Sequence, residues 1–335
     1  MLENYSKLFE DSEFLDAIDT NRLCLFLGSG IALNIGMPDW QDLSKEIVKF
    51  CFKNKIITRS EKLKLFNSSF SPIKIISICT QKIEKSSIEN EFNDLLKDIF
   101  YEKPRKNLTK SNIYGYLKDI YKEKKALILQ TNYDVMLEKY LSYEDSINRG
   151  FYVPYSQKGN FSKDKDKVLD SIIYLHGRFS GDSGDLECST YKSLILDKKQ
   201  YNKAYVLEND IFYKNQKDFI KHILTNFYVL FLGYSLNDVE ILQMIANKPE
   251  TECYKGIGVI VDDCDAKNLE NEFNMEYLKV ASNGKIKTYI YDTECNGIKE
   301  GFSEVIQNLR NIIIDGKYKS FSTYKFRNPL EVDFE

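Results

Sequence analysis

Short, continuous apolar runs alternate with longer amphipathic segments along most of the chain. The runs share an apolar residue at nearly every position and are RLCLFLG (22–28), ALILQTN (126–132), SIIYLHG (171–177), FYVLFLG (227–233) and GIGVIVDD (256–263). Such runs are typical of strands that are covered on both faces of a parallel sheet. A sixth run, IKTYIYD (286–292), alternates more, which predicts a position near an edge of the sheet.

The stretch between the first two runs lacks a comparable strand and is amphipathic with a helical period. In DWQDLSKEIVKFCF, the residues Leu43, Ile47 and Phe50 fall on one helical face, and Asp39 is the predicted N-cap. We therefore expect a helical insertion over 52–125. Because strands and helices alternate elsewhere, the chain is predicted to form a Rossmann-like α/β fold with a doubly wound, mostly parallel sheet. One domain over 1–315 and a C-terminal tail over 316–335 are expected.

Composition and charge argue against several classes of protein. The formal net charge of the 335 residues is -3, with lysine and glutamate spread along the chain, which is not the footprint of a nucleic-acid binder. The seven cysteines never form a C-x-x-C pair, so neither a zinc ribbon nor a disulfide framework, and no metal, is expected. No signal peptide and no apolar run of about 20 residues is present, so we expect a cytoplasmic protein without a membrane partner.

Chemistry-bearing residues follow four of the predicted strands, at the sheet edge where ligands bind in such folds. In the first, GSGIALNIG, Gly28 allows a tight turn and Gly30 lets the backbone approach a phosphate at a helix N-terminus. A dinucleotide dehydrogenase would need glycine or alanine at position 33, which is Leu33, and an acidic residue about 20 residues further on. By itself, the motif fits a plain strand-to-helix turn equally well.

The other three strand ends carry amide, carboxyl, imidazole and hydroxyl groups. Asn132 and Asp134 are suited to orient ribose hydroxyls and a water, although an Asx turn that caps the next helix is the simpler interpretation. His176 is either a hydrogen-bonded core histidine or a general base. Gly233 and Ser235 offer a second set of contacts to a nucleotide, or only a turn before a helix.

Taken together, the order of these motifs resembles the sirtuin-like domains of bacterial antiphage defence proteins, from about Leu23 to Asp238. The motifs that carry the resemblance are Gly28-Ser29-Gly30, Pro38-x-Trp40, Thr131-Asn132-Tyr133-Asp134, His176-Gly177 and Gly233-Tyr234-Ser235-Leu236-x-Asp238. The resemblance implies a substrate, NAD, and a role for each matching residue. Gly28, Ser29 and Gly30 would line the phosphates, Asn132 and His176 would serve catalysis, Asp134 would hold the nicotinamide ribose or its neighbours, and Gly233 and Ser235 would contact the adenosine side.

The sequence also departs from true sirtuins. Ala32 stands where sirtuins have serine or threonine, the four-cysteine zinc module is absent, and no signature of an acyl-lysine groove is present. These departures count against protein deacylation, and the resemblance to the defence proteins implies NAD+ hydrolysis to nicotinamide and ADP-ribose. We predict that Asn132 positions a water and that His176 accepts a proton. The alternatives are an NAD-dependent protein deacylase or ADP-ribosyltransferase, and a non-catalytic module that senses NAD or ADP-ribose.

The resemblance further implies a toxic effector that stops infection by depleting NAD. Such an enzyme has to be gated in its own cell. We expect the gate to be a homo-oligomer or a separately encoded partner, either a nucleotide sensor or an ATPase.

Overall fold

The computed structural model contains one parallel sheet in the part of the chain that it describes. The described residues are 3–108, 111–144, 172–181, 189–206, 211–234, 239–246, 256–262, 276–277, 279–291 and 298–316. The strands are β1 (Glu3–Asn4), β2 (Leu23–Leu27), β3 (Ala126–Gln130), β4 (Ile172–Tyr174), β5 (Tyr228–Leu232), β6 (Ile257–Asp262) and β7 (Ile286–Tyr291). Their order is β1-β7-β6-β5-β2-β3-β4, and every pairing is parallel.

The strand order reverses between β2 and β5. From β2 the chain builds β3 and β4 on one side, then returns so that β5 pairs with the free side of β2 and β6 and β7 follow. This is the doubly wound arrangement that the sequence predicts, with its topological switch point at β2 and β5. All six predicted strands are confirmed. The sixth, β7, is next to the edge, which is formed by the two-residue strand β1 that the sequence analysis missed.

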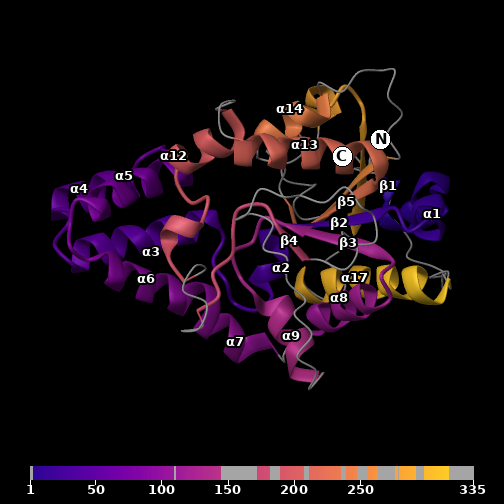
Figure 1. Ribbon diagram of the computed structural model, residues 1–335, viewed down its shortest axis with the longest axis horizontal. Helices are drawn as coiled ribbons and strands as arrows, with labels where there is room; N and C mark the ends of the chain where they lie inside the picture. The colour runs from indigo at the N-terminus through magenta and orange to yellow at the C-terminus, as the bar shows by residue number, and fades with distance from the viewer. Residues whose placement is uncertain are drawn as a thin grey trace, which may run out of the picture.

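Both faces of the sheet are covered, which explains the continuous apolar runs. Along β2, Leu23, Leu25 and Leu27 belong to one hydrophobic core, whereas Cys24 and Phe26 belong to the other. Helices α8 (Asn112–Lys122) and α17 (Ile298–Asp315) cover the first face, and α13 (Ile211–Asn226) and α14 (Val239–Ala246) cover the second (Figure 1). A strand with two buried faces requires apolar residues at every position.

The segment between β2 and β3 is helical wherever it has regular structure in the described residues. Its elements are α2 (Ser29–Leu33), α3 (Trp40–Lys53), α4 (Arg59–Phe66), α5 (Pro72–Glu84), α6 (Glu89–Lys97), the π-helix η2 (Asp98–Glu102), α7 (Lys103–Asn107) and α8. The Asp39 carboxylate accepts a hydrogen bond from the Asp42 amide at 2.7 Å, so the predicted N-cap is confirmed. Leu43 and Ile47 are buried and Phe50 is half-buried against the same core, as the helical period predicts.

The remaining helices precede β2 or follow β3. They are the 3-10 helix η1 (Tyr5–Glu10), α1 (Ser12–Asp19), α9 (Met136–Glu144), the 3-10 helix η5 (Tyr191–Ser193), α12 (Lys198–Tyr201) and the π-helix η6 (Asn202–Val206). Within the described residues, no helix is both long enough and apolar enough to cross a membrane. The predicted tail beyond Gly316 lies outside the described residues.

Candidate functional site

Four strand ends meet at the carboxyl edge of the sheet. Leu27 is in register with Gln130 on β3 and with Leu232 on β5, and Gln130 is in register with Tyr174 on β4. The residues that follow these positions therefore leave the sheet side by side. The tertiary structure thus gathers the motifs that the sequence carries up to two hundred residues apart.

The glycine turn after β2 packs directly on the turn after β5. The Gly28 amide donates to the Leu232 carbonyl at 2.9 Å, and the Gly30 amide donates to the Gly233 carbonyl at 2.8 Å. A Cβ at Gly28 would clash with the Gly233 carbonyl oxygen, and one at Gly30 would lie 2.7 Å from the Gly233 Cα. Close contact between two backbones therefore requires these glycines, in addition to any role toward a ligand.

The contacts of this turn bear on the predicted phosphate site. The amides of Gly28 and Gly30 are already engaged with carbonyls of the protein. Ser29, the half-buried first residue of α2, has an amide that the helix itself does not use. Contact between the three residues and NAD phosphates stays a prediction, with Ser29 as the group best placed to donate.

Asn132 links the ends of β2 and β3. Its side-chain Nδ2 donates to the Gly28 carbonyl at 3.0 Å, and the residue is 7% exposed. In the described part of the chain, the Oδ1 of this amide accepts no hydrogen bond. The anchored Nδ2 fixes the orientation of the amide, so that Oδ1 is the acceptor available to a water or a ribose hydroxyl.

Asp134 begins α9 with an Asx turn, because its Oδ1 accepts a hydrogen bond from the Met136 amide at 3.0 Å. The simpler interpretation of this residue is therefore correct. The residue is 2% exposed, and its Oδ2 is buried without a hydrogen-bond partner among the described residues. Burial raises the pKa of the carboxyl to about 6, although the Met136 amide opposes the rise. An orphaned acceptor beside Asn132 fits a ligand that brings hydroxyl groups.

His176 is buried beneath two tyrosines. It is 1% exposed, its Nε2 lies 2.9 Å from the Tyr205 hydroxyl, and the Tyr201 ring meets its ring edge-on at a centroid distance of 5.1 Å. The Ile195 amide donates to the His176 carbonyl at 2.8 Å. His176 thus has the contacts of a core histidine, and at the same time lies at the end of β4, next to the strand that carries Asn132.

A buried ion pair beside this edge was not anticipated from the sequence. The Arg178 Nη1 lies 3.3 Å from the Glu138 Oε2, and both side chains are buried. Burial, and then the nearby Glu138 charge, raise the pKa of Tyr174 well above its ordinary value. The signal available in the sequence was a charged residue directly after the His-Gly pair, in a segment that is otherwise apolar.

Three residues of the predicted motifs remain, namely Trp40, Gly233 and Ser235. Trp40 is half-buried against both hydrophobic cores and meets the Tyr133 ring edge-on at 6.1 Å, which is the position of a core anchor. Gly233 adopts a φ of 59° at the end of β5. Ser235 lies outside the described residues.

No group of three or more histidine, cysteine, aspartate or glutamate side chains within the described ranges is arranged to hold a metal ion. Cys24, Cys51 and Cys79 are buried free thiols. The other four cysteines lie outside the described residues.

Comparison with known proteins relates part of the chain to a family. Residues 126–272 match the SIR2-like domain family, and no curated protein matches the chain. The matched range runs from β3 through β6 and includes Asn132, Asp134, His176 and Gly233, whereas the glycine turn after β2 precedes it. The sheet nevertheless places β2 between two matched strands. SIR2-like domains are in general NAD-dependent enzymes, and residues 126–272 of this chain are similar to them.

Proposed function

We propose that this protein is an NAD+ hydrolase that releases nicotinamide and ADP-ribose. The observation that carries the proposal is the juxtaposition of Asn132 and His176 at the ends of adjacent parallel strands, inside the range that matches the SIR2-like domain family. The buried Oδ2 of Asp134, which has no hydrogen-bond partner among the described residues, supports a hydroxyl-rich ligand at the same edge.

The residues have separate tasks in this proposal. Because nicotinamide leaves as a neutral ring, the protein does not need to supply a general acid. It has to orient the ribose, exclude bulk water and present one water to the ribose carbon. Asn132 positions that water through Oδ1, since its Nδ2 is anchored on the Gly28 carbonyl. His176 accepts a proton from the water or from a ribose hydroxyl.

The burial of His176 implies a closed conformation. A general base has to come within hydrogen-bond reach of the proton it accepts, directly or through one intermediate. Tyr201 and Tyr205 cover the ring in the described conformation, and the hydroxyl of Tyr205 is the group in contact with Nε2. In our proposal these tyrosines shift when the enzyme is activated, so that the substrate reaches His176. This fits an enzyme that has to be kept inactive until it is needed.

The chain offers a matched control for the test, because it has only one other histidine. His222 lies on α13, half-buried against Asn226, and its ring contacts Phe227 directly before the start of β5, at the opposite end of that strand from Gly233. Nicotinamide release from NAD should fall about a hundred- to ten-thousand-fold in His176→Ala and in Asn132→Ala, and should be retained in His222→Ala. Circular dichroism checks that all three variants are folded. Undiminished turnover in both site variants would refute the roles assigned to them.

The acceptor of the ADP-ribosyl group separates hydrolysis from the related activities. Products formed with NAD alone, in water, identify a hydrolase. A requirement for an acylated peptide identifies a deacylase, and a label transferred from NAD to protein identifies an ADP-ribosyltransferase. Binding of NAD that stays intact under every condition would identify a sensing module.

We further propose that the protein is a toxic effector of antiphage defence that acts by depleting NAD. The gate is an oligomer of this chain or a separately encoded sensor or ATPase. Bacteria that express the wild-type protein should lose cellular NAD on phage infection, whereas those that express His176→Ala should not. The mass of the native complex, measured before and after infection, shows whether the protein assembles with itself or with a partner. Unchanged NAD in infected cells would contradict the proposed defence role.

A further inference from the structure

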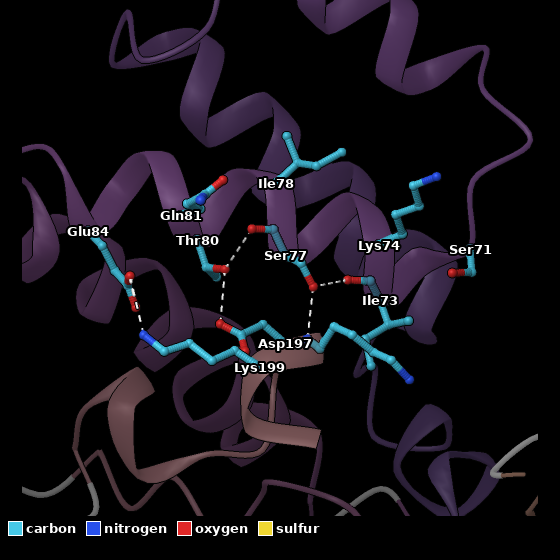
Figure 2. A pocket seen from close by; sticks show the side chains of 11 residues that line it. Ser71, Ile73, Lys74, Ser77, Ile78, Thr80, Gln81, Glu84, Asp197 and Lys199 are labelled. Atoms are coloured by element: carbon cyan, nitrogen blue, oxygen red, sulfur yellow. Dashed lines mark hydrogen bonds and ion pairs between the residues drawn. The ribbon is translucent and has the colours of Figure 1, made fainter. Parts of the chain in front are cut away.

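A cavity of about 730 Å³ lies between α5 of the helical insertion and the start of α12 (Figure 2). Ser71, Ile73, Lys74, Ser77, Asp197 and Lys198 are among the residues that line it, and we name it the α5–α12 pocket. Its volume is within the range of about 300–1,000 Å³ that small-molecule sites occupy. It is therefore larger than a single inorganic ion needs.

The charges of the pocket are unevenly distributed. At one end, Lys199 lies 3.9 Å from Glu84. The only other lining carboxylate, within the described residues, is Asp197, whose oxygens accept hydrogen bonds from Thr80 at 3.2 Å and from the Gln200 amide at 2.9 Å. Both carboxylates are thus directed at partners in the protein.

The opposite end is basic. Lys74 lines this end, and its ammonium lies 3.7 Å from the centre of the Phe70 ring. Lys198 also lines it, and its backbone amide donates a hydrogen bond to Ser77, which lies one turn after Lys74 on α5. Ser71 lines the same end, and its side chain makes no capping hydrogen bond to α5. Two ammonium groups and a hydroxyl suit a phosphate group, which accepts several charge-assisted hydrogen bonds. Ile73 and Ile78 add apolar walls for the organic part of a ligand.

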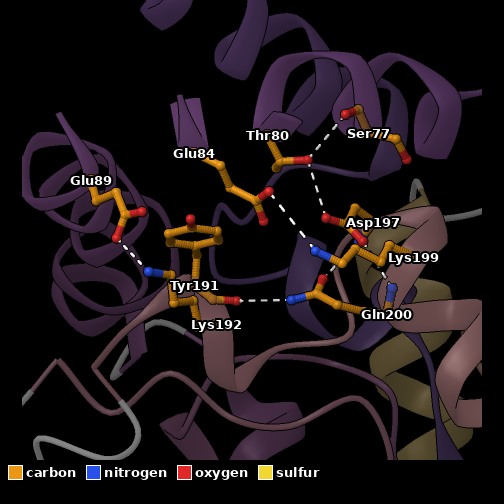
Figure 3. A network of polar contacts seen from close by, with 9 residues as sticks. All are labelled: Ser77, Thr80, Glu84, Glu89, Tyr191, Lys192, Asp197, Lys199 and Gln200. Carbon is orange, nitrogen blue, oxygen red and sulfur yellow. Dashed lines mark hydrogen bonds and ion pairs between the residues drawn. The ribbon is translucent and has the colours of Figure 1, made fainter. Parts of the chain in front are cut away.

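The pocket is connected to His176 through α12, a helix of four residues. On one side, α12 is tied to α5 by the bond from Thr80 to Asp197, the N-cap of α12 (Figure 3). The bond from the Lys198 amide to Ser77 joins the same two helices. On the other side, its last residue, Tyr201, packs on the His176 ring. Because α12 is a single turn, a displacement of its first residue also displaces Tyr201.

We propose that the α5–α12 pocket binds a small phosphorylated molecule and thereby controls the access of substrate to His176. The binding site stands on the cavity and its charges, whereas the control of His176 rests on the proposed function. A ligand changes the position of α12 only if it binds one conformation of the protein more tightly than the other.

The binding experiment uses the full chain with adenosine monophosphate and inorganic phosphate as probes, adenosine as the uncharged control, and calorimetry as the readout. We expect adenosine monophosphate to bind and adenosine to bind at least about tenfold more weakly. In Lys74→Gln/Lys198→Gln, the affinity for the phosphate should fall about tenfold or more. Lys192→Gln is the matched control, because Lys192 pairs with Glu89 on the same network without lining the pocket (Figure 3).

Several outcomes would overturn the site. The first is that neither adenosine monophosphate nor inorganic phosphate binds at millimolar concentration. The second is that the double lysine variant binds them as tightly as the wild type. The third is that binding is lost in Asn132→Ala instead, which would locate the probe at the strand ends. Where NAD is cleaved, the bound probe should change the rate about fivefold or more in the wild type and not in the double variant. An unchanged rate with the probe bound overturns the control of His176. A chain that binds the phosphate through Lys74 and Lys198 but never cleaves NAD supports the site and refutes the proposed hydrolase.

Discussion

Replacing Asp134 by asparagine tests whether the buried carboxylate of Asp134 lowers the free energy of unfolding. The residue is 2% exposed, and one of its oxygens has no hydrogen-bond partner in the described part of the chain. Burial raises its pKa from the ordinary value of 3.8 to about 6. An ionised carboxylate that is buried without a full set of partners opposes folding, which a protein tolerates most readily where function requires it.

The sign and the size of the effect follow from the raised pKa. A carboxyl with a higher pKa in the folded state favours folding when it is protonated, so its contribution is fully present below about pH 3.8 and is lost as the pH rises through about 6. At about 1.4 kcal/mol per pKa unit, the loss by neutral pH is about 3 kcal/mol. Asparagine keeps the acceptor for the Met136 amide but adds two buried donors, which cost about 1–3 kcal/mol if unpaired. The pH dependence is therefore a sharper test than the stability at one pH.

The assay is urea unfolding followed by the fluorescence of Trp40, the single tryptophan, which packs on Tyr133 next to the substituted residue. Between about pH 4 and pH 7, the stability of Asp134→Asn relative to the wild type should rise by about 2.4 kcal/mol, because part of the full effect is already lost at pH 4. Asp11 acts in the opposite direction, because Lys287 and Tyr289 lower its pKa against the effect of burial, but it is present in both proteins and cancels. Asp39→Asn, at an exposed helix N-cap, is the control. A relative stability that is the same at both pH values would refute the reasoning.

Two further substitutions test the packing around the site. Arg178→Met leaves the Glu138 carboxylate buried without the guanidinium that lies 3.3 Å away, and should lower the free energy of unfolding by about 3–5 kcal/mol. Unfolding of this variant at the same urea concentration as the wild type would contradict the expected loss. Gly233→Ala forces a side chain into φ of 59° and against the Gly30 Cα at 2.9 Å, and should cost more than the about 1–2 kcal/mol of the conformation alone. Gly284→Ala is the comparison, because Gly284 has φ of 74° and an added Cβ would have no atom within 4 Å, so its loss of stability measures the conformational cost alone. Thermal melts measure the loss in both variants, and equal losses would exclude an effect of the backbone contact at Gly233.

The strands were predictable because their signal is local. Each residue of β2, β3 and β5 is buried, and all of them except Gln130 are apolar, so the run is visible in a short window of the sequence. Asp39 was predictable for the same reason, since an N-cap acts within one turn. The strand β1 was not, because two residues carry no periodicity and pair with β7 almost three hundred residues away.

The strand ends were predictable as a set, but their contacts were not. The rule that parallel strands present their carboxyl ends at one edge predicted that Asn132 and His176 would lie at the same edge of the sheet, on neighbouring strands. The tyrosines that cover His176 gave no signal, because Tyr201 and Tyr205 belong to a chain segment whose position depends on the helical insertion. The sequence predicted that Gly30 lets the backbone approach a phosphate. In the structure, the missing side chains of Gly30 and Gly233 allow the two turns to pack on each other.

Local sequence was sufficient to predict which segments become strands, which edge of the sheet carries the polar groups and which family those groups resemble, because burial and turn chemistry act over a few neighbouring residues. Three properties are visible only in the folded protein. Within the described residues, the buried Asp134 has an oxygen without a hydrogen-bond partner, His176 lies beneath Tyr201, and α12 connects Tyr201 to a pocket with a basic end. These properties depend on the atoms that surround a side chain. Those atoms come from segments distant in the sequence, and no local pattern records them.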